Sequence, residues 1–570
     1  MTRVVVTGAT GFIGRRLVER LVKHGYNGTG AQVVGTSRGP RPDWAPPAVE
    51  WHALDLASAE PAAIAAIVGR DAVVIHCAAN ASARAGQDGY RNNVESVERL
   101  IAGLKAATPQ RVVYVSSIGA VDRVPSDDCR APLSEQSVPN PLTVYGRSKR
   151  VGEQRIAASG LPYAIVRPTW VYGPHMRADS HIRYFLSMVR KGSAVTRINF
   201  PGRVSIIHVD DLCDALLVTA QHPKALGRAF FAADGEPISL GQMYRELGEL
   251  TGRVAGRMNV PGFAAGIARA LRRFLPFSVQ LLNSDVLVGD ETPLRDLGFV
   301  SRVPRRTGFI ELARATAAPG KRWIVTGAAR GIGRALATQL YCDGHALEAT
   351  DRDDDGLASL QRECPDAAIF TGDLTTDAGR AALAARVGDG PLGGLVNCAG
   401  VGVRGDAATA SMEAQEKLVQ LNVVALMEGT ALAVRRLREQ ADGGVVVNVA
   451  SSSALQPLAG MAAYAASKAF VLNYSEAVAV ECAGSTVRII TICPGGTDTG
   501  FQAAAGVKRA AEEKLVPAAD AAAVIFAAIV RGVSSTVYIG LRVHAMGLLA
   551  RVLPRRSNAA LWGRLMNSMR

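Results

Sequence analysis

Two glycine-rich stretches of the chain begin the same kind of supersecondary structure. TGATGFIGRR occupies Thr7–Arg16, and the differently spaced TGAARGIGRA occupies Thr326–Ala335. Each stretch follows a short apolar run rich in β-branched residues and precedes a helical pattern, so each predicts a strand, a tight turn and a helix. A chain that starts this arrangement twice is expected to form two α/β domains in tandem.

Strand-like apolar runs alternate with helical patterns from residue 3 to about 220, and again from about 322 to about 540. This alternation predicts the α/β class, with two doubly wound parallel-sheet Rossmann domains in tandem. We place the first domain at residues 1–312, with a small C-terminal substrate lobe drawn mainly from 175–300. A linker at 313–320 and a second domain at 321–570 follow.

The spacing of the glycines differs between the two turns. The first turn contains Gly8, Gly11 and Gly14, and the second contains Gly327, Gly331 and Gly333. A recent tandem duplication would have preserved one spacing. We therefore expect a fusion of two distant relatives.

Composition argues against a secreted or membrane-spanning protein. With 48% hydrophobic and 20% charged residues, the chain is expected to be well folded. A strand-like run begins at Arg3, which leaves no room for a secretory signal. The longest apolar run, Ala521–Val530, is about half of the ~20 residues that a spanning helix needs, so we expect no integral membrane protein.

Cysteine usage and charge exclude two further classes. The eight cysteines form no CxxC pair and no Cys/His cluster, which favours a reducing cytoplasm and no metal site. The net charge of +14 comes from dispersed arginines, without a helix-turn-helix or finger pattern. We interpret it as a solvated basic surface and expect no nucleic-acid partner.

The first glycine-rich turn is typical of a dinucleotide-binding fingerprint. Its glycines allow close backbone approach, and the N-terminus of the next helix offers free N–H groups to a pyrophosphate. The second predicted strand ends at Arg38, where an acidic residue would bind a ribose 2′-hydroxyl. Because a guanidinium suits a 2′-phosphate, we expect NADP(H) in the first domain.

Further motifs of the first half include VVIHCAA at Val73–Ala79, YGRSK at Tyr145–Lys149 and IVRPTWVYGP at Ile165–Pro174. Together they resemble the extended short-chain dehydrogenase/reductase family, and its 3β-hydroxysteroid and dihydroflavonol-type branch in particular, over essentially all of this half. The resemblance implies cofactor contacts from Gly8, Thr10, Gly11, Phe12, Ile13, Gly14, Arg38, Asp55, Leu56, Ala78, Ala79, Pro168 and Val171.

Tyr145 and Lys149 are four residues apart, so on a helix they share one face. An ammonium beside a phenol favours the phenolate, and we expect it to lower the pKa of the tyrosine. The resemblance implies that Tyr145 is the acid/base, that Lys149 also holds the nicotinamide ribose, and that Ser117 polarises the substrate oxygen. Ser116 is the alternative serine, and a surface Tyr–Lys pair without function is the alternative interpretation.

Two features of the first half bear on its substrate. Ser117 is followed by Ile118 and Gly119 and lacks the Asp-Glu pair of the family's sugar-nucleotide dehydratases, which disfavours dehydration. The apolar segments Val260–Leu275 and Phe277–Leu287 favour a cleft for a hydrophobic alcohol or ketone. Core packing explains these leucines about equally well.

The second half contains NCAG at Asn397–Gly400, YAASK at Tyr464–Lys468 and PGGTDT at Pro494–Thr499. These motifs resemble the compact 250-residue subtype of the same family. The resemblance implies that Ser451 binds the reacting oxygen, that Tyr464 and Lys468 repeat the pair of the first half, and that Asn422 holds a proton-relaying water. A strand-end Asn422 that merely caps a bend is the alternative. The implied cofactor contacts are Gly327, Arg330, Gly331, Ile332, Gly333, Asp351, Arg352, Asp373, Leu374, Asn397, Ala399, Gly400, Pro494, Gly495 and Thr497.

The second half is expected to prefer NAD(H). Asp351 follows the second predicted strand, where a carboxylate accepts from ribose hydroxyls and repels a 2′-phosphate. Arg330 and Arg352 favour the phosphate instead. We give more weight to the carboxylate because its position decides directly whether a phosphate fits.

The last thirty residues, 541–570, interleave leucines with six arginines. Such a basic amphipathic tail could contact a membrane surface, close a lipophilic pocket or dock onto its own domain. The chain as a whole is predicted to be a bifunctional oxidoreductase of a small, lipophilic molecule and, by resemblance, a homo-oligomer. Epimerase chemistry in the first half, or a non-catalytic nicotinamide-binding half, are the alternatives.

Overall fold

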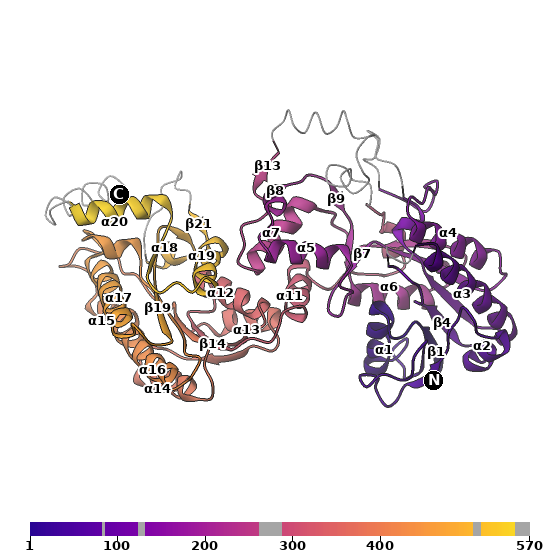
Figure 1. Ribbon diagram of the computed structural model, residues 1–570, viewed down its shortest axis with the longest axis horizontal. Coiled ribbons are helices and arrows are strands. Elements are labelled where there is room, and N and C mark those ends of the chain that lie inside the picture. Colours follow the sequence, from indigo (N-terminus) through magenta and orange to yellow (C-terminus); the bar gives the residue numbers. More distant parts are fainter. Residues whose placement is uncertain (83–85, 123–131, 261–287, 506–514, 553–570) are drawn as a thin grey trace. The chain divides into compact units, whose positions relative to one another are not determined.

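The structure is a computed structural model that describes residues 1–82, 86–122, 132–260, 288–505 and 515–552 (Figure 1). The chain forms two compact units. The first comprises Met1–Arg245 and Ala255–Leu312, and the second comprises Glu246–Val254 and Ala313–Arg570. Helix α11, Arg305–Ala315, runs into the segment predicted as a linker.

The first unit is built on seven parallel strands in the order β11-β6-β5-β4-β1-β2-β3. They are β1 (Thr2–Thr7), β2 (Ala31–Ser37), β3 (Glu50–Ala53), β4 (Val73–His76), β5 (Arg111–Val115), β6 (Tyr163–Pro168) and β11 (Ala229–Ala232). The winding reverses between β1 and β4, and ligands of such sheets bind beyond the carboxyl ends of the strands at this point. The predicted doubly wound fold is confirmed for this half.

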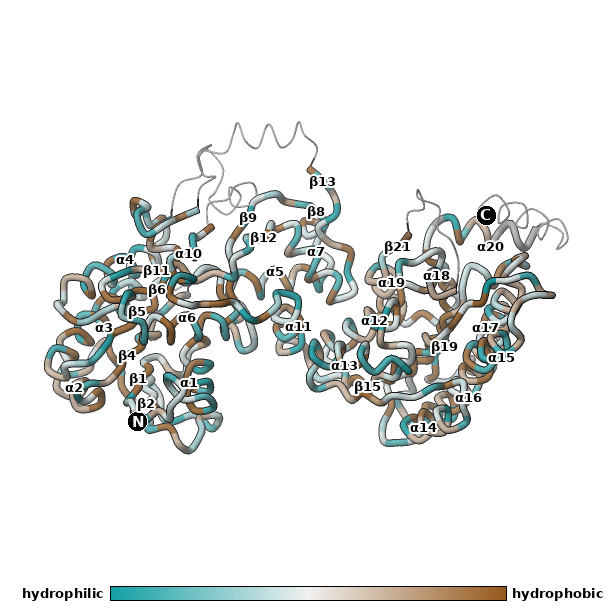
Figure 2. Tube along the Cα trace, turned by 180° about the vertical axis from the view of Figure 1, so that it is seen from behind, coloured by the Kyte–Doolittle hydropathy of each residue, from teal (hydrophilic) through white to brown (hydrophobic). Residues whose placement is uncertain are grey.

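Helices cover both faces of this sheet. One layer consists of α1 (Phe12–His24) and α6 (Val209–Gln221), and the other of α2 (Pro61–Val68), α3 (Gly86–Ala107) and α4 (Val144–Ala157). Because side chains alternate along a strand, Val4 and Val6 pack with the first layer and Val5 with the second. Covered faces explain the continuous apolar runs of these strands (Figure 2).

Smaller elements of the first unit lie beside the main sheet. They are α5 (His181–Arg190), α7 (Leu240–Leu250), α10 (Thr292–Arg295) and three strand pairs: β7 (Trp170–Tyr172) with β10 (Ile206–His208), β8 (Ile198–Asn199) with β13 (Met258–Asn259), and β9 (Arg203–Val204) with β12 (Ile238–Ser239). Within the predicted lobe range, α6 and β11 belong to the main fold instead. The segments Pro261–Leu275 and Phe277–Leu287 lie outside the described residues.

The second unit repeats this topology with seven parallel strands in the order β16-β15-β14-β17-β18-β19-β22. They are β14 (Arg322–Thr326), β15 (Ala346–Asp351), β16 (Ala368–Thr371), β17 (Gly394–Asn397), β18 (Gly444–Val449), β19 (Val487–Pro494) and β22 (Thr536–Ile539). Helices α14 (Asp377–Gly388), α16 (Leu426–Arg438) and α17 (Ala462–Glu481) pack on one face, and α12 (Gly331–Cys342) and α19 (Ala518–Val530) on the other. The predicted fold class is therefore confirmed for both halves.

One helical run of the second unit, Met412–Arg438, is long and apolar enough to cross a membrane by length and composition alone. It comprises α15 (Met412–Val419), a π-helical turn (Gln420–Ala425) and α16. Leu418, Leu426 and Leu437 of this run are buried in apolar clusters of the domain. We interpret this run as a core helix of the domain, because these leucines are part of its apolar clusters.

A buried ion pair fixes the helix that carries Tyr145 to the central strands of the first unit. Glu153 of α4 accepts hydrogen bonds from Arg167 Nε (2.8 Å) and Nη2 (2.9 Å) on β6, and from Ser116 Oγ (2.7 Å) after β5. Both charged side chains are almost fully buried. Arg150 Nη1 also binds Glu153 (3.0 Å), from a partly exposed position. Loss of Arg167 would therefore remove two buried hydrogen bonds to a charged group and leave Glu153 with Arg150 and Ser116.

We therefore expect Arg167→Met to destabilise the first domain by about 1.5–3 kcal/mol, because Arg150 still compensates the charge of Glu153. Arg91→Met, which removes an exposed pair with Asp88, should cost about 0–1 kcal/mol. Hydrogen exchange of amides in β5 and β6 measures both effects. Equal protection in the two variants would show that the buried pair does not hold α4 in place.

Candidate active sites

In each domain, one glycine brings the glycine-rich turn against the strand next to it. Gly8 has a φ of +67°, and a Cβ there would lie 2.6 Å from the Cα of Ala78. Gly327 has a φ of +69°, and its Cβ would lie 2.8 Å from the Cα of Ala399. Only glycine fits both the backbone conformation and this approach.

A second glycine in each turn brings the helix close to the strand. A Cβ on Gly14 would lie 2.3 Å from the carbonyl oxygen of Gly8, and a Cβ on Gly333 would lie 2.1 Å from that of Gly327. The N-termini of α1 and α12 consequently meet the carboxyl ends of β1 and β14. Each domain thus presents free backbone N–H groups where a pyrophosphate would bind.

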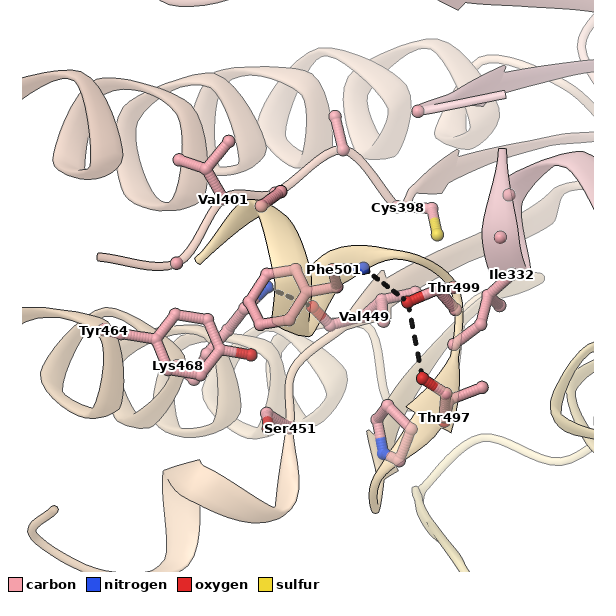
Figure 3. A pocket seen from close by; sticks show the side chains of 18 of the residues that line it. Ile332, Cys398, Val401, Val449, Ser451, Tyr464, Lys468, Thr497, Thr499 and Phe501 are labelled. Carbon is pink, nitrogen blue, oxygen red and sulfur yellow. Dashed lines mark hydrogen bonds between the residues drawn. The ribbon is translucent and has the colours of Figure 1, made fainter. Parts of the chain in front are cut away.

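A cavity of about 580 Å³ opens at this point in the second domain (Figure 3). Its lining includes Ser451, Tyr464 and Lys468 and most of the predicted cofactor contacts: Gly327, Arg330, Gly331, Ile332, Gly333, Asp351, Arg352, Asp373, Leu374, Ala399, Gly400, Pro494, Gly495 and Thr497. Asn397 differs. Its side chain is buried beneath the cavity and donates to Thr430 Oγ1 (3.1 Å) and Asn448 Oδ1 (2.9 Å). That side chain braces strands β17 and β18 and does not line the cavity.

The serine, tyrosine and lysine of the second domain come together at one end of the cavity (Figure 3). Ser451 and Tyr464 both line the cavity, and Ser451 Oγ accepts from the amide of Ser453 (3.1 Å). Lys468 is buried and its Nζ donates to the carbonyl oxygen of Val449 (2.8 Å), the last residue of β18. Burial lowers the pKa of Lys468 to about 8, because the charged ammonium loses hydration.

We expected the lysine to lower the pKa of the tyrosine, and this prediction is wrong: the pKa is raised in both domains. Burial raises the pKa of Tyr464, and the nearby Ser451 hydroxyl opposes this rise. Burial likewise raises the pKa of Tyr145 to about 12, with Arg177 opposing. Desolvation of the phenolate outweighs the nearby charges, so both phenols hold their protons at neutral pH.

Asn422 is mid-helix, in the π-helical turn between α15 and α16, so the strand-end alternative is wrong. Its Oδ1 accepts from the amide of Val401 (3.0 Å), and its Nδ2 donates to the carbonyl oxygen of Val401 (2.9 Å) and to Ser467 Oγ (3.1 Å). A Cβ on Gly400 would lie 3.3 Å from both Asn422 Oδ1 and Lys468 Nζ. The asparagine and the lysine therefore meet beside Gly400.

The first domain has the same arrangement. Lys149 Nζ donates to the carbonyl oxygen of Val115 (2.7 Å) and lies 6.0 Å from the ring centre of Tyr145. Burial lowers the pKa of Lys149 to about 8. Ser117 follows β5 directly after Ser116, and its Oγ accepts from the amide of Gly119 (3.1 Å). Ser116, in contrast, is buried and its Oγ donates to Glu153 (2.7 Å).

Sequence reasoning assigned no role to Asn93, the counterpart of Asn422. Asn93 Oδ1 accepts from the amide of Asn80 (2.7 Å), and its Nδ2 donates to the carbonyl oxygen of Asn80 (3.1 Å) and to Ser148 Oγ (3.0 Å). These bonds match those of Asn422 one by one. The signal was present, because an Asn-Val pair lies in the helix after the corresponding strand in both halves.

The remaining predicted cofactor residues of the first domain surround the same strand ends. Gly11, which comes after Thr10, is the N-cap of α1, and the helix begins with Phe12 and Ile13. Asp55 and the buried Leu56 come after β3, and Ala79 comes after β4. Pro168 is the last residue of β6, and Val171 lies in β7. Arg38 follows β2 and is exposed, and no hydrogen bond or ion pair is recorded for it among the described residues. Its guanidinium is therefore available to a ligand.

The nucleotide end of the second domain is more acidic. Asp351 Oδ2 accepts from the amide of Ala329 in the glycine-rich turn (3.1 Å), and its Oδ1 accepts from the amide of Arg352 (2.8 Å). Arg330, one of the two cations that favoured a 2′-phosphate, forms an exposed ion pair with Asp353, and Arg352 also lines the cavity.

The start of the basic tail docks onto its own domain. Helix α20, Leu541–Val552, buries Val543 against the core, and Met546 lines the cavity. A Cβ on Gly495 would lie 3.0 Å from Val543 Cγ2, so this contact is close. Residues 553–570 of the predicted tail lie outside the described residues.

Two parallel Rossmann sheets with serine, tyrosine and lysine at their carboxyl edges define a class, the nicotinamide-dependent oxidoreductases. The family comparisons agree. Residues 4–232 match the NAD dependent epimerase/dehydratase family, and residues 321–510 match short chain dehydrogenase. The chain belongs to the short-chain dehydrogenase/reductases and combines one domain of each kind in an NAD(P)-dependent oxidoreductase.

Three curated relatives illustrate the range of similarity. The chain is 28% identical over 353 residues to 4-hydroxy-2-methyl-3-oxo-4-farnesyl-3,4-dihydroquinoline-1-oxide ketoreductase of Stigmatella aurantiaca, covering 55% of this chain and 96% of the relative. It is 34% identical to D-erythrulose reductase of Gallus gallus, in a match that covers 31% of this chain and 70% of the relative. It is 28% identical to UDP-glucose 4-epimerase of Vibrio cholerae, in a match that covers 33% of this chain and 60% of the relative.

The lowered pKa of Lys468 predicts a pH-dependent stability difference. Between pH 8 and 10.5 the unfolded lysine binds a proton that the folded one does not, so wild-type stability rises with pH in this window. Lys468→Met lacks this dependence. Its stability gain over the wild type should reach at most about 3 kcal/mol below pH 8 and shrink toward pH 10.5.

Urea unfolding at pH 7, 8, 9 and 10 measures this difference. Lys417→Met, which removes an exposed ammonium paired with Glu413, should not show the trend. A constant difference between Lys468→Met and the wild type across the pH range would contradict the account of Lys468.

Proposed function

We propose that both domains are catalytic and that each transfers a hydride between a nicotinamide and a carbonyl or secondary alcohol. The observation that carries the proposal is the repeated set of contacts: a buried lysine bound to the last carbonyl of a strand, a tyrosine four residues before it, and a serine just after that strand. A non-catalytic domain would not need to maintain this set. Its presence in both halves supports two reactions in one chain.

Each residue has a distinct task in this proposal. A bound nicotinamide supplies or accepts the hydride at C4. The serine hydroxyl holds the reacting oxygen, and the tyrosine, protonated at neutral pH, donates its proton to that oxygen as the carbonyl is reduced. The lysine binds the nicotinamide ribose and, with the asparagine beside it, returns a proton from solvent. Oxidation runs the same steps in reverse.

We propose NADP(H) for the first domain and NAD(H) for the second. Exposed Arg38 at the end of β2 suits a 2′-phosphate. At the equivalent place in the second domain, Asp351 would repel such a phosphate and accept from ribose hydroxyls. The ion pair of Arg330 with Asp353 offsets one of the two opposing charges, and Arg352 is the other.

The proposed substrate is a small, lipophilic carbonyl compound or alcohol. Leu458, Met461, Phe501 and Met546 line the cavity of the second domain. For the first domain, support comes from the Stigmatella relative, whose name describes a ketoreductase of a farnesylated ring. That match covers 55% of the chain, more than residues 321–570 could supply, so it includes part of the first domain.

Epimerisation in the first domain is the second candidate, supported by its family match and by the Vibrio relative. An epimerase returns the hydride to the same substrate and consumes no cofactor. Net oxidation of NADPH therefore distinguishes the candidates.

Self-association is also proposed, on the basis of exposed apolar side chains on the helices of the second domain. Met412, Val419, Phe470 and Val480 are exposed on α15 and α17. A second copy of this domain would bury them.

Replacement of each tyrosine by phenylalanine tests the proposed chemistry. Tyr464→Phe should lower kcat of the second domain by about 10²–10⁴-fold and leave an activity that prefers NADPH. Tyr145→Phe should do the reverse and leave an activity that prefers NADH. Steady-state assays with a panel of lipophilic ketones and both cofactors measure the two losses.

Tyr163→Phe is the matched control, because this hydroxyl is exposed at the start of β6 and bonds only the carbonyl of Gly227 among the described residues. It should retain both activities. Unchanged turnover in either active-site variant would contradict the role of that tyrosine.

A further inference from the structure

Gln456 is a buried polar residue of the cavity that no step of the proposed chemistry uses. It ends the short 3₁₀ turn Ser452–Leu455 that begins after Ser451, and its side chain is only 7% exposed. It lines the cavity together with Ser451 and Tyr464. Its Oε1 has no hydrogen-bond partner within the described parts of the chain.

An unpaired amide is unusual in a folded interior. Buried polar side-chain atoms nearly always have a partner, because the unpaired state forfeits the hydrogen bonds that water would make. Where such an atom adjoins a ligand cavity, a ligand can supply the missing bond. Thr350 Oγ1 is also unpaired at this cavity, but Thr350 precedes Asp351 at the nucleotide end. Gln456 is adjacent to the reacting residues instead.

Several apolar side chains line the cavity close to the reacting residues. Leu458, Met461 and Tyr464 form a buried cluster, and Phe501 packs against it with its ring centre 5.3 Å from that of Tyr464 (Figure 3). Met546 of α20 adds a further apolar side chain to the lining. Arg404, Ser452, Ser453 and Gln502 are polar and also line the cavity, but among the described residues none of these four has a buried side-chain atom without a partner, as Gln456 does.

We propose that Gln456 determines specificity by hydrogen bonding a second oxygen function, a hydroxyl group, on an otherwise apolar ketone or alcohol. The inference rests on the proposed carbonyl chemistry of this domain. The unpaired atom, Oε1, is an acceptor, and a hydroxyl group is a small donor that pairs with it. The preferred substrate class is thus hydroxyketones, with the hydroxyl group one or two carbons from the reacting carbonyl.

Three ketones of one skeleton test the proposal in the full chain carrying Tyr145→Phe, so that only the second domain turns over. They are 1-phenylpropan-1-one and its 2-hydroxy and 3-hydroxy derivatives, each assayed with NADH. At least one hydroxyketone should exceed the parent ketone in kcat/KM by about tenfold or more, because an unmet amide penalises the ligand that lacks the hydroxyl group. Gln456→Leu should remove this preference.

Gln456→Met is the second variant, in case Gln456→Leu does not fold, and Gln361→Leu is the control at an exposed glutamine of α13 (Asp354–Glu363). The control should keep the preference. An unchanged ratio in a folded Gln456 variant, or a wild-type preference for the parent ketone, would overturn the inference alone. Failure to reduce any of the three ketones would contradict the proposed carbonyl chemistry and the inference together.

Discussion

A buried lysine bound to the end of a strand organises each candidate active site. Lys149 binds the carbonyl oxygen of Val115, and Lys468 binds that of Val449. The bond fixes the helix that carries the tyrosine against the strand that leads to the serine. Burial removes water from the ammonium group and makes its charged form less favourable, so the pKa values of both lysines are lowered. Such a cost is typical of groups retained for function.

The two domains share this core but differ around it. Asn93 and Asn422 make the same bonds to backbone and to the serine before the lysine, although their local helices differ. The first domain adds the buried pair of Glu153 and Arg167 behind the site. Different glycine spacings and opposite charges at the ends of β2 and β15 fit a fusion of distant relatives better than a recent duplication.

Much of the fold and of the candidate sites could be predicted because the relevant signals are local. The glycine-rich turns, the strand–helix alternation and the four-residue spacing of tyrosine and lysine are all visible in the sequence. The resemblance already favoured Ser117, but the physical reason that separates it from Ser116 depends on Glu153, a residue distant in sequence that binds the Ser116 hydroxyl. The sequence also did not reveal that the side chain of Asn397 lies outside the cavity lining, because its hydrogen-bond partners, Thr430 and Asn448, are distant in sequence.

Other features needed three-dimensional burial to become apparent. The pKa of each tyrosine is set by desolvation, which sequence spacing does not report, so the expected lowering was wrong. Asn422 looked compatible with a strand end because its helix contains a π-helical turn within an apolar run. Whether the amide oxygen of Gln456 has a hydrogen-bond partner depends on the residues around it in space, which the sequence does not show.

The central claim is that the chain holds two independent nicotinamide sites. Native mass spectrometry of the wild-type protein with NADPH and NADH together counts the bound dinucleotides directly. The account predicts two per chain, one of each kind. A maximum of one dinucleotide per chain at saturating concentrations of both would contradict it.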